Sequence, residues 1–187
     1  DAFFQKRSKD YTNLSHEKSQ LLEFVTYFSR KFNFSLRDTE QFFYKIKIAI
    51  LATAINESFH PILLTFLIFV KEYNPAIYEN YIDKKNNEEE IILFLYTIFK
   101  ENEKFENRLC RIIESELIKA TTNRFNQTIS PSITIHKLKI ENNRDTDEQI
   151  NYSKDVISFS KKIYDNINLE NILKKIELTK QFVFDVI

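Results

Sequence analysis

Few residues of this chain are of the types that carry chemistry, and they are scattered. The 187 residues include three histidines and one cysteine. His16, His60 and His136 lack partners at the spacing of a metal motif, so each is expected to be structural. Cys110 lies among apolar residues, which indicates a small core residue rather than a nucleophile. A single cysteine also excludes a disulfide within the chain.

Arg37 is the charged residue with the most unusual position. It falls in the first turn of a helix expected from Leu36, where the helix dipole disfavours a cation. A cation placed there is expected to have an anionic partner elsewhere. Arg37 is therefore the candidate binding residue of the chain. The alternative is a salt bridge to Glu40 at i+3 or to a carboxylate on another helix, since Gln41 at i+4 has no charge.

Charge and aromatic patterns give no clear nucleic-acid signature. The 27 Lys and Arg residues balance the 27 Asp and Glu residues, and the aromatic residues fall at core spacing rather than in a basic surface array. The Glu88–Glu90 run is typical of a solvated helix start. Short lysine doublets, which are expected on solvated faces, occur at residues 84–85, 161–162 and 174–175.

Composition excludes several classes of enzyme. The sequence has no glycine, so it contains neither a phosphate-binding P-loop nor a dinucleotide fingerprint. The chain alone is not expected to bind a cofactor or to be an enzyme of a common nucleotide-hydrolysing type. It also has no methionine, and hence no start residue, which indicates a piece of a longer protein.

The first half of the chain repeats helical patterns with clear end signals. A helix from Ser15 to about Asn33 is expected from an apolar stripe at Leu21, Val25, Phe28 and Phe32. Ser35 and Asp38 form a capping-box pattern for the next helix, which runs to about Thr53. The buried face of that helix is expected to carry Leu36, Phe43, Ile46 and Ile50.

Two prolines mark the helices that follow. Pro61 opens a helix in which Ile62–Val70 is almost wholly apolar, so it is expected to be buried on nearly every side. The segment is too short for a membrane span, which needs about 20 residues. Asn74 and Pro75 open a short helix that runs to about Ile82.

The second half is also mostly helical in pattern. The helix after Asn87 either runs through residues 100–104 or breaks there, and residues 121–132 are expected to form a loop. The stretch from Ile133 to Ile140 is the one that resembles a strand. Thr146 and Gln149 form a second capping box, and Asn168 caps a last helix that runs to about Leu178.

The stretch Phe32–Glu40, F-N-F-S-L-R-D-T-E, resembles a segment of the KAP family of P-loop NTPases. In that family the pattern f-x-L-S-L-R-D-x-E lies C-terminal to the nucleotide-binding core. The similarity covers about residues 15–82, and Phe34 stands where the family usually has Leu. The Walker A and Walker B elements are absent. The resemblance implies ATP and Mg²⁺ binding for the whole protein, cytoplasmic or membrane-associated placement, and roles such as phage exclusion in bacteria.

The sequence thus predicts an all-α fold, a helical bundle of six to eight helices with at most a small strand pair near residues 133–140. Residues 1–14 form a polar lead-in, residues 15–120 the bundle and residues 121–187 an appended helical tail. The expected function is the helical lid and interaction region of a KAP-type ATPase, in which Arg37 senses nucleotide on a separate core. The alternative is a stand-alone helical adaptor that binds another protein.

Overall fold

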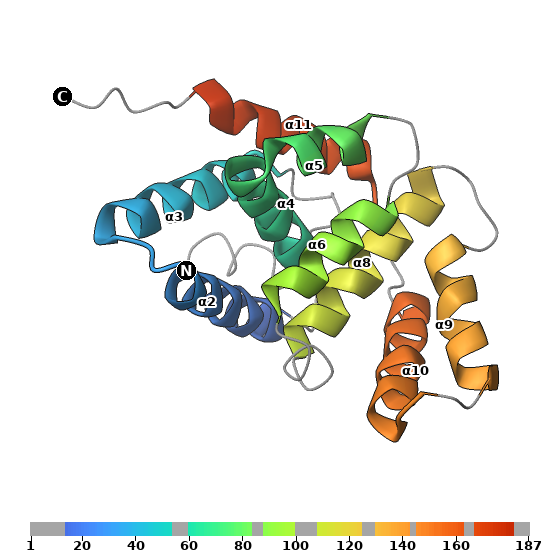
Figure 1. The fold of residues 1–187 in the computed structure, drawn as a ribbon. Helices are drawn as coiled ribbons and strands as arrows, with labels where there is room; N and C mark the ends of the chain where they lie inside the picture. The colour runs from blue at the N-terminus through green and yellow to red at the C-terminus, as the bar shows by residue number, and fades with distance from the viewer. Residues whose placement is uncertain are drawn as a thin grey trace. The chain divides into compact units, whose positions relative to one another are not determined.

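The fold is all-α, as predicted, within the residues that the structure describes. A computed structural model describes residues 14–53, 60–83, 88–99, 108–124, 130–142, 145–162 and 167–181. These residues form nine α-helices and one short 3₁₀ helix, η1, and they contain no strand (Figure 1). One helix more than the expected range is present, because the strand-like stretch is helical.

The chain divides into two compact units. One contains residues 1–69 and 170–187, and the other contains residues 70–169. The divisions lie at residues 69 and 169, whereas the sequence pattern placed one at residue 120. Helix α4 (Pro61–Tyr73) contributes its first nine residues to the first unit and its last turn to the second.

The first unit is built on the aromatic face of α2 (Leu14–Lys31). The predicted stripe is confirmed at Leu21, Val25 and Phe28, which are buried, and Phe24 joins them. The ring of Phe28 stacks on that of Phe24, with centroids 4.1 Å apart, and meets the edge of Phe69 from α4 at 4.6 Å. These ring contacts hold α4 against α2.

Helix α2 ends as the sequence predicts, in a tight turn at Asn33. Its φ of 50° is the one positive φ among the described residues, and asparagine tolerates this region better than most side chains. The N–H of Phe34 donates to the carbonyl of Ser29 at 2.9 Å, and that of Asn33 donates to the carbonyl of Arg30 at 3.4 Å. This Schellman pattern ends α2 at Lys31, and the turn residue Asn33 lies two residues before Ser35.

The buried face of α3 (Leu36–Leu51) differs from the expected one. Ile46 and Ile50 are buried as predicted, but Leu36 is 78% exposed and Phe43 is 41% exposed. The buried positions are Phe42, Ile46, Ala49 and Ile50. At about 100° per residue, Leu36 and Phe43 fall at the edge of the arc that these buried residues occupy on the helix. The predicted face was therefore rotated toward one side of the buried face.

The burial predicted for Ile62–Val70 is confirmed in helix α4. Pro61 begins it, and every residue of Ile62–Val70 is buried, Thr65 included. The first unit also contains α11 (Leu169–Leu178), whose first residue belongs to the other unit, and η1 (Thr179–Gln181), which contacts α3.

The second unit contains five helices around one core. The short α5 (Pro75–Ile82) packs on α6 (Glu88–Ile98), and α6 lies beside α8 (Arg108–Arg124) (Figure 1). Helix α10 (Asp147–Lys162) packs on both α8 and α9 (Pro131–Asn142). Asn74 caps α5, and Thr146 and Gln149 form the expected capping box of α10.

Helix α9 replaces the strand expected between Ile133 and Ile140. Ser130 and Pro131 stand at its start, and its buried side is polar, with Ser132 9% exposed and His136 3% exposed. The apolar Ile135 and Leu138 are about half exposed. Because Ser132 and His136 are buried while Ile135 and Leu138 are half exposed, the spacing of the apolar residues does not predict this helix. The expected loop is likewise shorter, since α8 continues to Arg124.

Candidate functional site

Arg37 lies in an exposed first turn whose backbone is fixed by hydrogen bonds. The Ser35 N–H donates to Asp38 Oδ2 at 3.0 Å, and the Asp38 N–H donates to Ser35 Oγ at 3.1 Å. The Ser35 hydroxyl also donates to Asp38 Oδ2 at 2.7 Å. These bonds form the predicted capping box and set the direction in which α3 leaves the turn.

The hydrogen bonds of this turn favour the charged form of Asp38. The pKa of Asp38 is lowered, chiefly by the hydrogen bond from the Ser35 side chain, then by the Ser35 backbone N–H, with a smaller effect of the Arg37 charge. Arg37 and Glu40 are both exposed. In the part of the chain that the structure describes, no ion pair joins Arg37 to Glu40 or to another carboxylate. Its guanidinium is therefore free to meet an anion.

A second polar cluster, which the sequence did not reveal, lies inside the second unit. Glu114 of α8 is 1% exposed and accepts three hydrogen bonds. Tyr96 of α6 donates to its Oε1 at 2.5 Å, His136 Nε2 of α9 lies 2.8 Å from the same oxygen, and Tyr152 of α10 donates to Oε2. Four helices thus meet at one carboxylate.

The cluster continues beyond the carboxylate on both sides. His136 Nδ1 lies 3.0 Å from the hydroxyl of Ser153, and Cys110 Sγ lies 3.3 Å from the hydroxyl of Tyr152. Because a carboxylate oxygen only accepts, Nε2 of His136 is the donor toward Glu114. Burial raises the pKa of Tyr152 and that of Tyr96, and the adjacent Glu114 charge raises both further.

Ser153, His136 and Glu114 have the residue types of a hydrolytic triad, but their burial argues against catalysis. Ser153 is 1% exposed and His136 is 3% exposed, so a substrate has no access to the hydroxyl. A triad serine needs an exposed Oγ beside an oxyanion site. The cluster instead ties four helices together through a fully satisfied carboxylate. Cys110 is completely buried, which confirms its place in the core.

The prediction that the Glu88–Glu90 run is solvated is wrong for Glu88. This residue is 4% exposed, whereas Glu89 is exposed. Its Oε1 accepts from the hydroxyls of Ser130 at 2.5 Å and Ser132 at 2.7 Å, and from the backbone N–H of Ser132 at 3.2 Å. Glu88, the first residue of α6, therefore caps the N-terminus of α9, where the helix dipole favours a negative charge.

The remaining expected features are placed as follows. Lys174 is exposed as predicted, but Lys175 is buried. Residues 84–85 and 100–104 lie outside the described residues, as does the side chain of His16. No cluster of residues able to hold a metal ion occurs in the described ranges, and none of the helices described there is both long and apolar enough for a bilayer.

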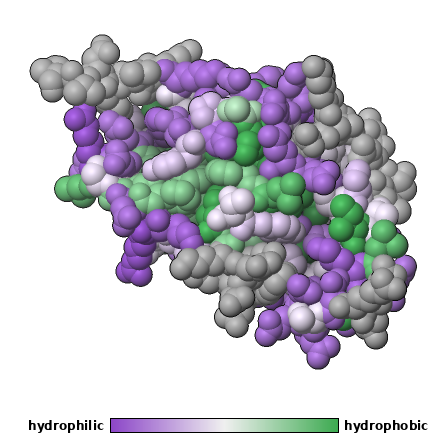
Figure 2. Space-filling model, viewed as in Figure 1, coloured by the Kyte–Doolittle hydropathy of each residue, from purple (hydrophilic) through white to green (hydrophobic). Residues whose placement is uncertain are grey.

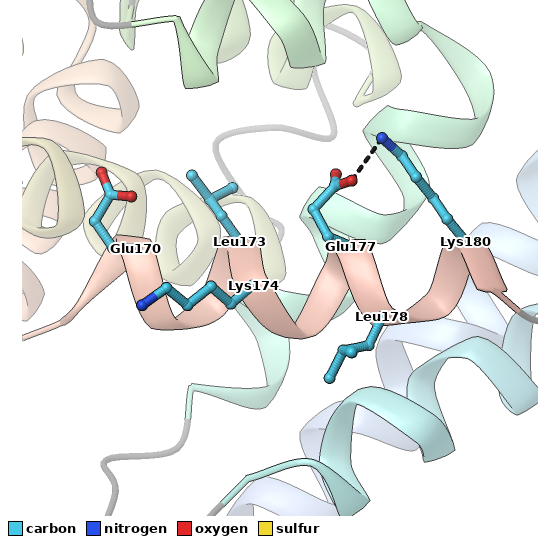
Figure 3. Close-up of a pocket in the computed structure, with 6 residues that line it drawn as sticks. All are labelled: Glu170, Leu173, Lys174, Glu177, Leu178 and Lys180. Carbon is cyan, nitrogen blue, oxygen red and sulfur yellow. Dashed lines mark ion pairs between the residues drawn. The ribbon is translucent and has the colours of Figure 1, made fainter.

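A shallow hollow follows α11 and η1 of the first unit (Figure 3). The Glu177 carboxylate pairs with Lys180 Nζ at 2.5 Å on one side, and Leu178 points the other way. All six residues that line it come from this one stretch of helix. An open helix surface of this kind does not enclose a substrate, so the hollow is no candidate active site.

Comparisons of the chain with family models, with curated proteins and with solved structures gave no match. The candidate functional site is therefore defined by the chain's own geometry, as the exposed first turn of α3 with Arg37.

Proposed function

We propose that this chain is the helical lid and interaction region of a KAP-type P-loop ATPase. In this proposal the nucleotide is bound by a separate core, and Arg37 contacts the terminal phosphate of ATP. The resemblance of Phe32–Glu40 to the KAP segment supports it. The observation that carries it is the exposure of Arg37 in a turn fixed by the Ser35–Asp38 capping box.

The geometry suits an arginine that acts on a ligand delivered from outside. The guanidinium has five donors in a fixed fork, which matches two oxygens of a phosphate group. Arg37 points away from the buried face of α3, which is formed by Phe42, Ile46, Ala49 and Ile50. Because the backbone of the first turn is already fixed, binding of the phosphate costs less conformational entropy.

The chain supplies one phosphate contact rather than a nucleotide site. It has no glycine loop, and the described residues contain no cluster able to hold Mg²⁺. ATP and Mg²⁺ therefore belong to the core, where the metal neutralises the charge that develops on the transferred phosphoryl group. The role of Arg37 is to stabilise that charge, and its movement with α3 reports whether the terminal phosphate is present.

The second candidate is a stand-alone helical adaptor that binds another protein. The exposed apolar side chains of α3 favour it, because Leu36 is 78% exposed and Leu51 is 63% exposed. In an adaptor Arg37 is a solvated surface residue. The two candidates therefore differ in what depends on Arg37.

The test is ATP hydrolysis by the protein that contains this chain together with its nucleotide-binding core. Arg37→Ala is expected to lower kcat about 10³-fold or more, and Arg37→Lys is expected to restore only part of it, because a lysine is a single-point donor. Arg30→Ala is the matched control, since Arg30 is exposed in the last turn of α2. Unchanged hydrolysis in Arg37→Ala, or no ATP hydrolysis by the intact protein, would overturn the proposal.

A further inference from the structure

The outward face of α3 carries apolar and charged residues in an ordered arrangement. Six residues make up this face, and they fall within an arc of about 100° around the helix axis, since successive residues are rotated by about 100°. All are exposed, and α3 is a helix over which hydrophobic groups reach the surface (Figure 2). From the start of the helix to its end they are Leu36, Glu40, Phe43, Tyr44, Lys47 and Leu51.

The order of these residues is symmetric about the middle of the helix. Leu36 and Leu51 lie at equal distances from the midpoint between Phe43 and Tyr44, one toward each end of α3. Glu40 and Lys47 also lie at equal distances from it, but carry opposite charges. A face with this order is complementary to a copy of itself that runs in the opposite direction.

We propose that this face binds a second copy of the chain, with the two α3 helices antiparallel about a two-fold axis. The axis passes between Phe43 and Tyr44, so that Leu36 of one chain meets Leu51 of the other. Glu40 of each chain then faces Lys47 of the other, which gives two equivalent ion pairs. Such a self-complementary contact is the isologous interface typical of homodimers.

Charge complementarity selects the antiparallel copy. Glu40 and Lys47 lie seven residues apart, whereas ion pairs within a helix form at three or four residues. No ion pair involves either of them in the described part of the chain. In a parallel pairing in register, each charge would face its own kind. The antiparallel order alone satisfies both charges of both chains.

The size of the face sets the expected strength. A helix of 16 residues is about 24 Å long, and one helix pair buries less than the roughly 800 Å² per partner of a standard stable interface. The dimer is therefore weak and depends on concentration. Salt weakens it, because exposed ion pairs are screened. This inference uses the outward face of α3 and does not depend on the proposed role of Arg37.

The experiment is sedimentation velocity of the full chain over a concentration series at low ionic strength. The wild-type chain is expected to pass from monomer to dimer. Glu40→Lys leaves only lysines at the two charged positions, and Lys47→Glu leaves only glutamates, so each variant alone should dimerise at least tenfold more weakly. An equimolar mixture of these two variants should form a heterodimer, and the double variant should regain the homodimer.

Glu23→Lys is the control, because Glu23 is exposed on α2 and its charge reversal should leave the dimer unchanged. Circular dichroism of each variant checks that the helices are intact. A chain that stays monomeric at every concentration would overturn the proposal and leave the face to another protein. A dimer that both charge reversals leave unchanged would place the contact elsewhere and overturn it as well, as would a mixture that stays monomeric.

Discussion

At the scale of single residues, Glu114 is the most constrained side chain of the second unit. It is 1% exposed and accepts from Tyr96, Tyr152 and His136. A buried carboxylate is tolerated when all of its partners are in place. The same low-dielectric surroundings make the loss of any partner costly.

Glu114→Ala is therefore expected to lower the free energy of unfolding by about 3–5 kcal/mol, because three buried donors lose their acceptor. Urea denaturation of the full chain, followed by circular dichroism, measures this change. Glu141→Ala is the control, since Glu141 is exposed on α9 and should change stability by no more than about 0.5 kcal/mol. Equal effects of the two substitutions would mean that the cluster does not hold the unit together.

Three tyrosines with raised pKa values make the second unit sensitive to alkaline pH. Burial raises the pKa of Tyr81 from 10.0 to about 12, and it raises the pKa of Tyr96 and of Tyr152 as well. Below about pH 10 the folded and unfolded chains keep these protons equally. Between pH 10 and 12 the unfolded chain loses protons that the folded chain retains, so stability falls as pH rises.

Absorbance at 295 nm during an alkaline titration tests this expectation. Several of the nine tyrosines should ionise only together with the loss of helix, whereas in concentrated urea all nine should ionise near pH 10. Ionisation of all nine near pH 10 with the helical signal intact would contradict the raised pKa values of these three tyrosines.

At the scale of elements, α4 and α9 show why apolar pattern succeeds for one helix and fails for another. Ile62–Val70 is apolar at almost every position, so every side of this helix is hydrophobic and the sequence alone predicts that it is buried. The buried side of α9 carries Ser132 and His136. Both are accommodated because Glu88 of α6 binds Ser132 and Glu114 of α8 binds His136. A pattern of polarity along one segment carries no information on such partners.

Leu67→Ala in α4 is expected to destabilise the chain by about 2–5 kcal/mol, because Leu67 is completely buried and the substitution leaves a cavity. Leu22→Ala on α2 is the matched control, with the same change at a side chain that is 50% exposed. Thermal and urea unfolding of both variants measure the difference. A cost for Leu67→Ala as small as that for Leu22→Ala would show that α4 is not the centre of its unit.

Helix ends were the best predicted feature of the elements. The Ser35 and Thr146 side chains bond to their own backbone neighbours, and Asn33 tolerates a positive φ, so the sequence nearby is sufficient to predict these ends. The exposure of Leu36 and the burial of Glu88 depend on other helices instead. The position of Arg37 in a first turn is visible in the sequence, whereas the buried cluster around Glu114 is not, because its members lie far apart along the chain.

At the scale of the whole molecule, the absence of glycine fits the helices of the described residues. Asn33 forms a turn there, and Ser35, Asn74 and Thr146 cap helices. Helices α2 and α3 are joined by the Asn33 turn, which leaves Arg37 at the surface. The chain thus exposes the guanidinium of Arg37 on a turn fixed by the Ser35–Asp38 capping box. What it presents that group to is the central question of its function.

The proposal that Arg37 contacts the terminal phosphate of ATP is tested most directly by hydrogen exchange of this chain together with the proposed nucleotide-binding core. A non-hydrolysable ATP analogue should slow amide exchange in residues 35–40 more than ADP does, because only the analogue offers a terminal phosphate to Arg37. The difference should vanish in Arg37→Ala and persist in Arg30→Ala. Identical exchange of residues 35–40 with the analogue, with ADP and without nucleotide would contradict the account.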